Sequence, residues 1–172
     1  MYQLLKQIFV TGRKTEAPPV HDESLRVTAQ RLEKAMLAVL GRALVIRHID
    51  AGSCNGCELE INALGNPYYN LEGLGIRFVA SPRHADMLLV TGPVSRNMET
   101  ALRRTFDATP EPKLVVAVGD CGADGGIFGE SYASCGRVAN VIRVDEVVTG
   151  CPPAPIDILR GILKAVRRRV KA

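Results

Sequence analysis

The amino-acid sequence predicts an α/β protein in which a doubly wound, mainly parallel sheet follows an N-terminal helical extension. From Ala43 onward, short and almost continuously apolar segments alternate with helix-like segments, a pattern typical of parallel sheets covered by helices on both faces. The 172 residues, 47% of them hydrophobic and 23% charged, have the composition of one globular domain. No apolar run approaches the roughly 20 residues that a membrane-spanning helix needs.

The first part of the chain is predicted to be a helical arm with a linker. Residues 2–10 place three apolar side chains on one helical face, and a pair of prolines separates them from a second helix, expected from about Ser24. Gly41 is positioned to end that helix. We therefore expect the arm and linker at 1–42 and the main α/β domain at 43–172.

The main domain begins with a strand, a turn and a helix. The run ALVIRHID at 43–50 is apolar and rich in β-branched residues, which predicts the first strand. The turn AGSCNGC follows, and a helix is predicted from Glu58 to Leu64, where the Gly-Asn-Pro step at 65–67 ends it.

Four more strands and two more helices complete the predicted domain. The segments IRFVAS, DMLLVTG and KLVVAVGD predict the second, third and fourth strands, the fourth ending at Asp120, and VANVIRVDEVV contains a fifth. Ser95 is positioned to cap a helix from Arg96 to Ala108. Prolines lead into a last helix, whose predicted buried stripe consists of Ile158, Leu159, Ile162, Leu163 and Val166.

Four of the five cysteines follow predicted strands. Cys54 and Cys57 follow the first strand, Cys121 comes directly after the fourth, and Cys151 lies three residues beyond the fifth. The carboxyl ends of parallel strands share one edge of the sheet, which is where such folds place their ligands. We therefore expect the four thiols to meet there. Four thiolates suit either a tetrahedral zinc ion or an iron-sulfur cluster.

The spacing of the cysteines favours the cluster and leaves two alternatives open. Structural zinc sites usually combine two CxxC pairs, whereas here one CNGC pair is joined by two isolated cysteines, the last in a Cys-Pro step typical of cluster-binding runs. Flanking glycines leave backbone N–H groups free to approach sulfur. Zinc remains a competitor, and so does a dithiol redox site on CNGC alone. Cys135 has no partner at metal-ligand spacing and is interpreted as a buried residue.

Charge and targeting patterns exclude several classes of function. The net charge of +4 is concentrated in the last helix, aromatic residues make up only 5% and Trp is absent, so the footprint of a nucleic-acid-binding protein is missing. The run GADGGIFG lacks the lysine of a phosphate-binding Walker motif, and we reject nucleotide binding. The first residues do not read as a signal peptide, so we expect a cytosolic protein with reduced thiols.

The cysteine-containing segments resemble a known family. DAGSCNGCELEI, SPRHADMLLVTG, VGDCGADGGIFGESYA and VTGCPPAPIDILRGIL, spread from about Ile46 to Leu163, are similar to the 20 kDa subunit of respiratory NADH:quinone oxidoreductase and to the small subunits of nickel-iron hydrogenases. The resemblance implies a flavodoxin-like fold. It also implies one 4Fe-4S cluster whose ligands are Cys54, Cys57, Cys121 and Cys151.

Within this resemblance, the CNGC spacing favours the hydrogenase branch, because the quinone-reducing relatives carry two adjacent cysteines there. Exported hydrogenases have a twin-arginine leader and a C-terminal domain with further clusters, neither of which we recognise here. The expected relatives are therefore the membrane-bound, energy-converting hydrogenases similar to formate hydrogenlyase. A complex I-type quinone reductase subunit is the alternative.

The hydrogenase resemblance also implies partners and a location. The cluster would be proximal to a nickel-iron site in a separate large subunit, with a ferredoxin-like iron-sulfur subunit as its electron donor. Integral membrane subunits would anchor the complex, and this chain would be peripheral on the cytoplasmic side of the cell membrane. Its mechanism would be one-electron transfer.

Two acidic residues follow Cys57 at the start of a helix. Carboxylates suit the positive end of a helix dipole, and this reading is sufficient for Glu58. Glu60 matches a Glu that the quinone-reducing relatives carry three residues past their cysteines, which implies a tuning or proton role. Arg83 and His84 lie in the turn before the third strand and are interpreted as solvated.

Overall fold

A computed structural model describes residues 41–170, with side chains up to residue 168, and isolated positions at 6, 10, 23, 24, 26–28, 30, 31 and 34. The positions between 23 and 34 are helical. The arm and linker expected over 1–42 lie almost entirely outside the described residues, so this division of the chain stays a prediction.

Five parallel strands form a single sheet in the order β2-β1-β3-β4-β5. This is the strand order of a flavodoxin-like doubly wound fold, so the predicted fold class is confirmed. The strands are β1 (Leu44–Asp50), β2 (Ile76–Phe78), β3 (Met87–Thr91), β4 (Leu114–Val118) and β5 (Glu146–Val148). The direction of winding reverses between β1 and β3, at the point where such sheets open a crevice for ligands.

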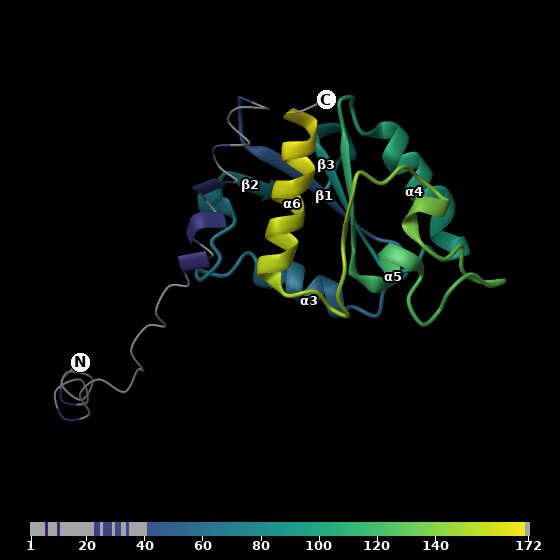
Figure 1. Cartoon of the computed structure of the whole chain (residues 1–172), viewed down its shortest axis with the longest axis horizontal. Coiled ribbons are helices and arrows are strands. Elements are labelled where there is room, and N and C mark those ends of the chain that lie inside the picture. Colours follow the sequence, from purple (N-terminus) through teal and green to yellow (C-terminus); the bar gives the residue numbers. More distant parts are fainter. Residues whose placement is uncertain are drawn as a thin grey trace.

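Helices cover both faces of the sheet (Figure 1). Helices α3 (Gly56–Ala63) and α6 (Pro155–Val170) pack on one face and α4 (Arg96–Ala108) on the other. The short helix α5 (Gly119–Asp124) follows β4. Single 3-10 turns η1 (Glu72–Leu74), η2 (Pro82–His84) and η3 (Val138–Asn140) complete the elements.

The alternation of side chains along the strands divides the core in two. On the face of α6, Leu44 and Ile46 of β1 pack with Ile158 and Ile162. On the face of α4, Ile49 of β1 lies in the same cluster as residues of α4 and η3. The predicted stripe of α6 is buried, each of its five residues being at most 7% exposed. No described helix combines the length and the apolar character that crossing a membrane requires.

Several predicted boundaries differ from the structure, among them the end of the second strand, which lies at Phe78 rather than Ser81. The fourth strand ends at Val118 rather than Asp120, because Gly119 turns the chain with a φ of 85°. The first helix begins at Gly56 rather than Glu58. The fifth strand is only three residues long, because the apolar segment before it forms η3 and a turn and fills the core beneath α4.

Candidate metal centre

The structure brings Cys54, Cys57, Cys121 and Cys151 to the carboxyl-terminal edge of the sheet. Cys54 lies in the turn after β1, Cys57 in the first turn of α3, Cys121 in α5, and Cys151 between β5 and α6. Figure 1 shows α3, α5 and the start of α6 together along this edge. All four thiols are free; those of Cys54 and Cys151 are exposed and the other two are half-buried.

The thiols are close enough to influence one another electrostatically. Burial, followed by the charges of Glu58 and of the three other thiols, raises the pKa of Cys57 to about 12. Burial and the charges of Cys151 and Cys54 also raise the pKa of Cys121. Four thiolates at this edge therefore repel one another, and a cationic centre bound between them would relieve the repulsion as the thiols lose their protons.

Two aspartates, whose carboxylates accept hydrogen bonds from backbone N–H groups, fix the loops that carry the cysteines. Asp50 Oδ1 accepts hydrogen bonds from the N–H groups of Gly52 and Ser53, each at 2.8 Å, which shapes the turn after β1. The N–H of Asp120 donates to the Gly150 carbonyl oxygen at 3.0 Å, and Asp120 Oδ1 accepts from the Gly150 N–H at 2.7 Å. This reciprocal pair fastens the end of β4 to the loop after β5.

Glycines allow the backbone to lie directly against the sulfur atoms. A Cβ atom added to Gly119 would lie 2.6 Å from Cys57 Sγ, and one added to Gly126 would lie 2.8 Å from Cys121 Sγ. Both glycines also have positive φ angles, of 85° and 56°. Any side chain at these positions would occupy the space of a ligand atom, so the surroundings of the thiols suit a compact thiolate-bound group.

The donor set suits a cluster held by four thiolates. Among the described residues, no three Cys, His, Asp or Glu side chains stand as a group ready to hold a single metal ion. Glu60 is half-buried on α3 and makes no hydrogen bond or ion pair with another described side chain. Its tuning or proton role, and the ligand roles of the cysteines, stay predictions.

Behind Cys57 lies a buried polar chain that the sequence analysis does not identify. Glu58, only 8% exposed, accepts a hydrogen bond from Thr91 Oγ1. His48 Nε2 lies 3.2 Å from Thr91 Oγ1 and 3.7 Å from Glu58 Oε1. Glu58 lies in the first turn of α3, as expected for a carboxylate that complements the helix dipole. That interpretation is incomplete, because its carboxylate points into the protein and accepts a hydrogen bond there. The available signal was a His and a Thr within otherwise apolar strands.

The polar chain also changes the properties of its histidine. Burial lowers the pKa of His48, and the nearby carboxylates of Glu58 and Asp50 only partly oppose this effect. The ring is therefore held mainly in its neutral form, in which Nε2–H can donate to Thr91 Oγ1 while the threonine hydroxyl donates to Glu58. Glu58 Oε2 is buried and has no hydrogen-bond partner among the described residues.

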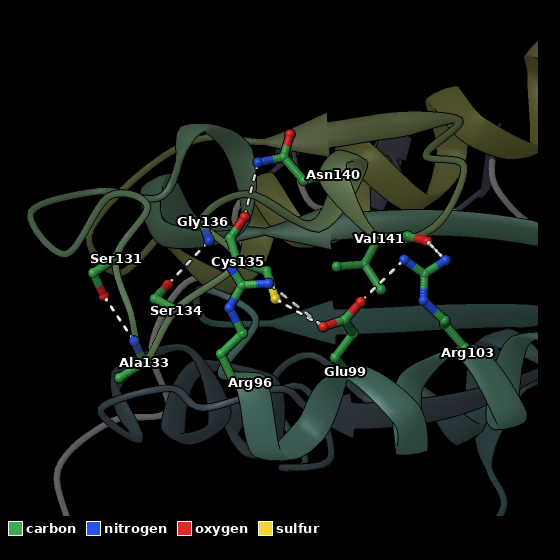
Figure 2. A network of polar contacts seen from close by, with 10 residues as sticks. All are labelled: Arg96, Glu99, Arg103, Ser131, Ala133, Ser134, Cys135, Gly136, Asn140 and Val141. Carbon is green, nitrogen blue, oxygen red and sulfur yellow. Dashed lines mark hydrogen bonds and ion pairs between the residues drawn. The ribbon is translucent and has the colours of Figure 1, made fainter.

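Cys135 lies apart from the other cysteines and is buried, as predicted, with 5% of its surface exposed. Figure 2 shows its Sγ pointing at Glu99 of α4, to which it donates at 3.3 Å. The Glu99 carboxylate also pairs with Arg103 at 3.1 Å and with Arg96 at 3.7 Å. Asn140 Nδ2 donates to the Cys135 carbonyl oxygen at 2.8 Å. This network ties the segment after α5 to the start of α4.

Arg83 and His84 are both exposed in η2, at the amino-terminal end of β3, which confirms their predicted place in a solvated turn. Ser95 is the N-cap residue of α4 with an extended backbone, as predicted, although its side chain makes no capping hydrogen bond.

The fold and this edge define a class of protein, namely doubly wound α/β proteins that present a group of cysteine thiols at the carboxyl ends of their strands. Residues 54–165 match the family described as NADH ubiquinone oxidoreductase, 20 Kd subunit. The chain belongs to this family, which confirms the family resemblance predicted from its cysteine segments.

Individual relatives agree with this membership. Over 145 residues the chain is 41% identical to the probable membrane-bound hydrogenase subunit mbhJ of Pyrococcus furiosus, covering 83% of this chain and 87% of that protein. Over 149 residues it is 38% identical to formate hydrogenlyase subunit 7 of Escherichia coli, covering 87% of this chain and 57% of that protein.

A solved structure is also similar, namely that of the membrane-bound sulfane sulfur reductase, an archaeal respiratory membrane complex. The matching chain has a TM-score of 0.67 and 30% identity, with 88% of this chain and 78% of that chain covered. The similarity therefore extends over most of the fold.

Proposed function

We propose that this chain is an electron-transfer subunit that carries one 4Fe-4S cluster in a membrane-bound nickel-iron hydrogenase. One observation carries the proposal: four thiols from three separate loops meet at one edge, against glycines that leave no room for a side chain. The proposed ligands are Cys54, Cys57, Cys121 and Cys151. When bound, such a cluster supplies reversible one-electron transfer.

The chain itself contributes position and environment. Asp50 and Asp120 hold the ligand loops through hydrogen bonds to backbone N–H groups. The thiols of Cys57 and Cys121 are half-buried, whereas those of Cys54 and Cys151 are exposed. The exposed side is therefore open to a partner protein with which electrons are exchanged. Burial, nearby charge and hydrogen bonds to sulfur are the means by which the chain would set the potential.

The names of the relatives support the proposed place of the chain in a membrane-bound hydrogenase. A membrane-bound hydrogenase subunit and a formate hydrogenlyase subunit share about two fifths of their aligned residues with this chain. We infer the same kind of assembly: a large nickel-iron subunit, a ferredoxin-like iron-sulfur subunit and integral membrane subunits. In it the chain would be a peripheral subunit on the cytoplasmic side of the cell membrane, supplying no complete active site of its own.

Glu60 is the proposed tuning or proton-handling residue near the cluster. It is half-buried on α3, one turn after Cys57. Replacing Glu60 by Gln removes a negative charge at nearly constant size, so the cluster potential is expected to rise. An unchanged cluster potential at neutral pH would show that Glu60 does not tune the cluster.

Purification of the full chain from its own cells under anaerobic conditions tests the proposed complex. The expected result is a co-purified large subunit with two CxxC pairs that hold nickel, and hydrogen evolution by the assembly. A large subunit without those pairs would identify the alternative, a quinone reductase of complex I type, the class after which the matching family is named. A chain that co-purifies with zinc and no iron would point to a zinc-bound structural protein.

A further inference from the structure

A cleft of about 330 Å³ opens at the amino-terminal edge of the sheet, opposite the cysteines. Its lining includes Arg42 before β1, Arg77 on the edge strand β2, and Arg83 and His84 of η2. The acidic residues of the lining are Asp86 and Glu111. The function proposed above makes no use of this cleft.

Both carboxylates in the cleft already have partners. Asp86 is 9% exposed; its Oδ1 accepts from Arg42 Nη2 at 2.6 Å and its Oδ2 from the Val45 N–H at 3.1 Å. Glu111 Oε2 accepts from the Lys113 N–H at 3.1 Å, and its Oε1 lies 3.5 Å from Lys113 Nζ. These acids are therefore largely compensated within the protein.

The two remaining arginines of the cleft are uncompensated. Arg77 and Arg83 are exposed, and neither forms an ion pair with any residue in the described part of the chain. Each guanidinium is always charged and offers several N–H donors in a planar fork, which matches the oxygens of a phosphate group. The cleft therefore carries an excess of positive charge and of free donors.

The wider distribution of charge agrees with this excess. Helix α6 runs antiparallel to the strands, so its exposed Arg167 lies toward the same edge as the cleft. The neighbouring Arg168 is paired with Glu146 at 2.8 Å and adds little to the excess. At the opposite edge, Asp120 and Asp124 lie in the helix that carries Cys121. The two edges are about 20 Å apart, the length of a seven-residue strand. An anion in the cleft would therefore leave the thiol edge free.

We propose that this cleft binds a phosphate group, the chemistry shared by an anionic phospholipid headgroup and a free phosphate monoester. Arg77 and Arg83 donate to the phosphate oxygens, and Arg42 stays on Asp86 and adds its charge at the rim. In a membrane-associated complex the headgroup is the source within reach, and the cleft would hold the amino-terminal edge of the sheet against the bilayer surface.

The test uses the full chain, loaded with its cluster under anaerobic conditions. One arm measures flotation with phosphatidylcholine vesicles that contain phosphatidylglycerol, and with pure phosphatidylcholine vesicles. A second arm titrates glycerol 3-phosphate, and a third titrates poly-glutamate. The cleft variant combines Arg77→Gln and Arg83→Gln. The control combines Arg104→Gln and Arg160→Gln, which removes two exposed arginines outside the cleft lining.

The cleft variant is expected to bind anionic vesicles roughly 25-fold more weakly than wild type, at about fivefold per arginine. It should therefore lose the preference for anionic over pure phosphatidylcholine vesicles, and the control variant should keep most of that preference. If the chain binds anionic vesicles but not glycerol 3-phosphate, the ligand of the cleft is a lipid headgroup. If it binds both, the phosphate group alone is sufficient for binding. The proposal is overturned if the wild-type chain binds neither anionic vesicles nor glycerol 3-phosphate, or if the cleft and control variants bind equally well. It is also overturned if poly-glutamate binds more tightly than both phosphate-containing probes. Matching unfolding curves of the two variants exclude loss of fold as the cause.

Discussion

Replacement of Gly119 by Ala tests the packing of the backbone against the proposed ligand Cys57. The added Cβ atom would lie 2.6 Å from Cys57 Sγ, whereas atoms of this size prefer separations of about 3.5 Å or more. Gly119 is the first residue of α5, directly after β4, and the thiol is on α3, so neither can move freely. Relief of the contact must displace the sulfur by roughly 1 Å.

The expected cost has two parts. The φ of 85° at Gly119 is unfavourable for any residue with a Cβ, at about 1–2 kcal/mol. Overpacking against the sulfur adds about 1–3 kcal/mol. The sum is about 2–5 kcal/mol of unfolding free energy, together with a ligand displaced from its position, so that the variant is expected to hold substantially less cluster.

Two matched glycines separate these effects. At Gly129 the φ is 54° and an added Cβ would meet nothing within 4 Å, so Gly129→Ala should cost about 1–2 kcal/mol from strain alone and keep its cluster. At Gly56 an added Cβ would lie 3.5 Å from Cys54 Sγ, an ordinary contact, and Gly56→Ala should be tolerated. The assays are anaerobic urea unfolding and the iron and acid-labile sulfide content of each variant.

Wild-type iron, sulfide and stability in Gly119→Ala would contradict the close approach of the backbone to sulfur. Equal loss of cluster in Gly129→Ala and Gly119→Ala would contradict it too, since backbone strain alone would then explain the loss.

Three further predictions follow from individual contacts. Replacement of any one of the four proposed ligand cysteines by Ser should lower the iron and sulfide content. Cys135→Ser should leave both unchanged, because the serine hydroxyl can also donate to Glu99. Equal loss in all five variants would contradict the assignment of the four ligands. Glu146 is 4% exposed and forms ion pairs with Lys164 at 2.5 Å and with Arg168 at 2.8 Å. Glu146→Gln should therefore lower the unfolding free energy measured in urea by about 1–2 kcal/mol, and an unchanged free energy would refute these contacts. Because burial depresses the pKa of His48, protonation of its ring favours the unfolded chain. The contribution of His48 to stability is therefore full above the pKa of a free histidine, about 6.5, and falls as the pH drops below it. The unfolding free energy from urea titrations should fall less steeply with decreasing pH in His48→Gln, and the same pH dependence in both proteins would contradict the assignment.

The arrangement of the strands was predictable because each apolar segment carries its own signal. The turns at Cys54 and Cys57 follow a strand whose β-branched residues and flanking glycines mark its end. The carboxyl-edge rule then predicted where Cys121 and Cys151 would meet them. None of this required knowledge of side-chain packing.

Other features depend on tertiary contacts that no local pattern encodes. Glu58 is buried because Thr91 and His48, from two different strands, face α3 at that point. Helix α5 has six residues and too few turns for a detectable period. The segment VANVIRVDEVV contains the fifth strand, as predicted, but the strand is confined to its last three residues, and Val141 packs in the core beneath α4 from a turn.

The central claim is most directly tested by measuring iron, acid-labile sulfide and zinc in the full chain after anaerobic purification, with the four single Cys→Ser variants as controls. The account predicts about four iron and four sulfide per chain, with little zinc, and loss of both in every ligand variant. About one zinc per chain with no acid-labile sulfide would contradict it.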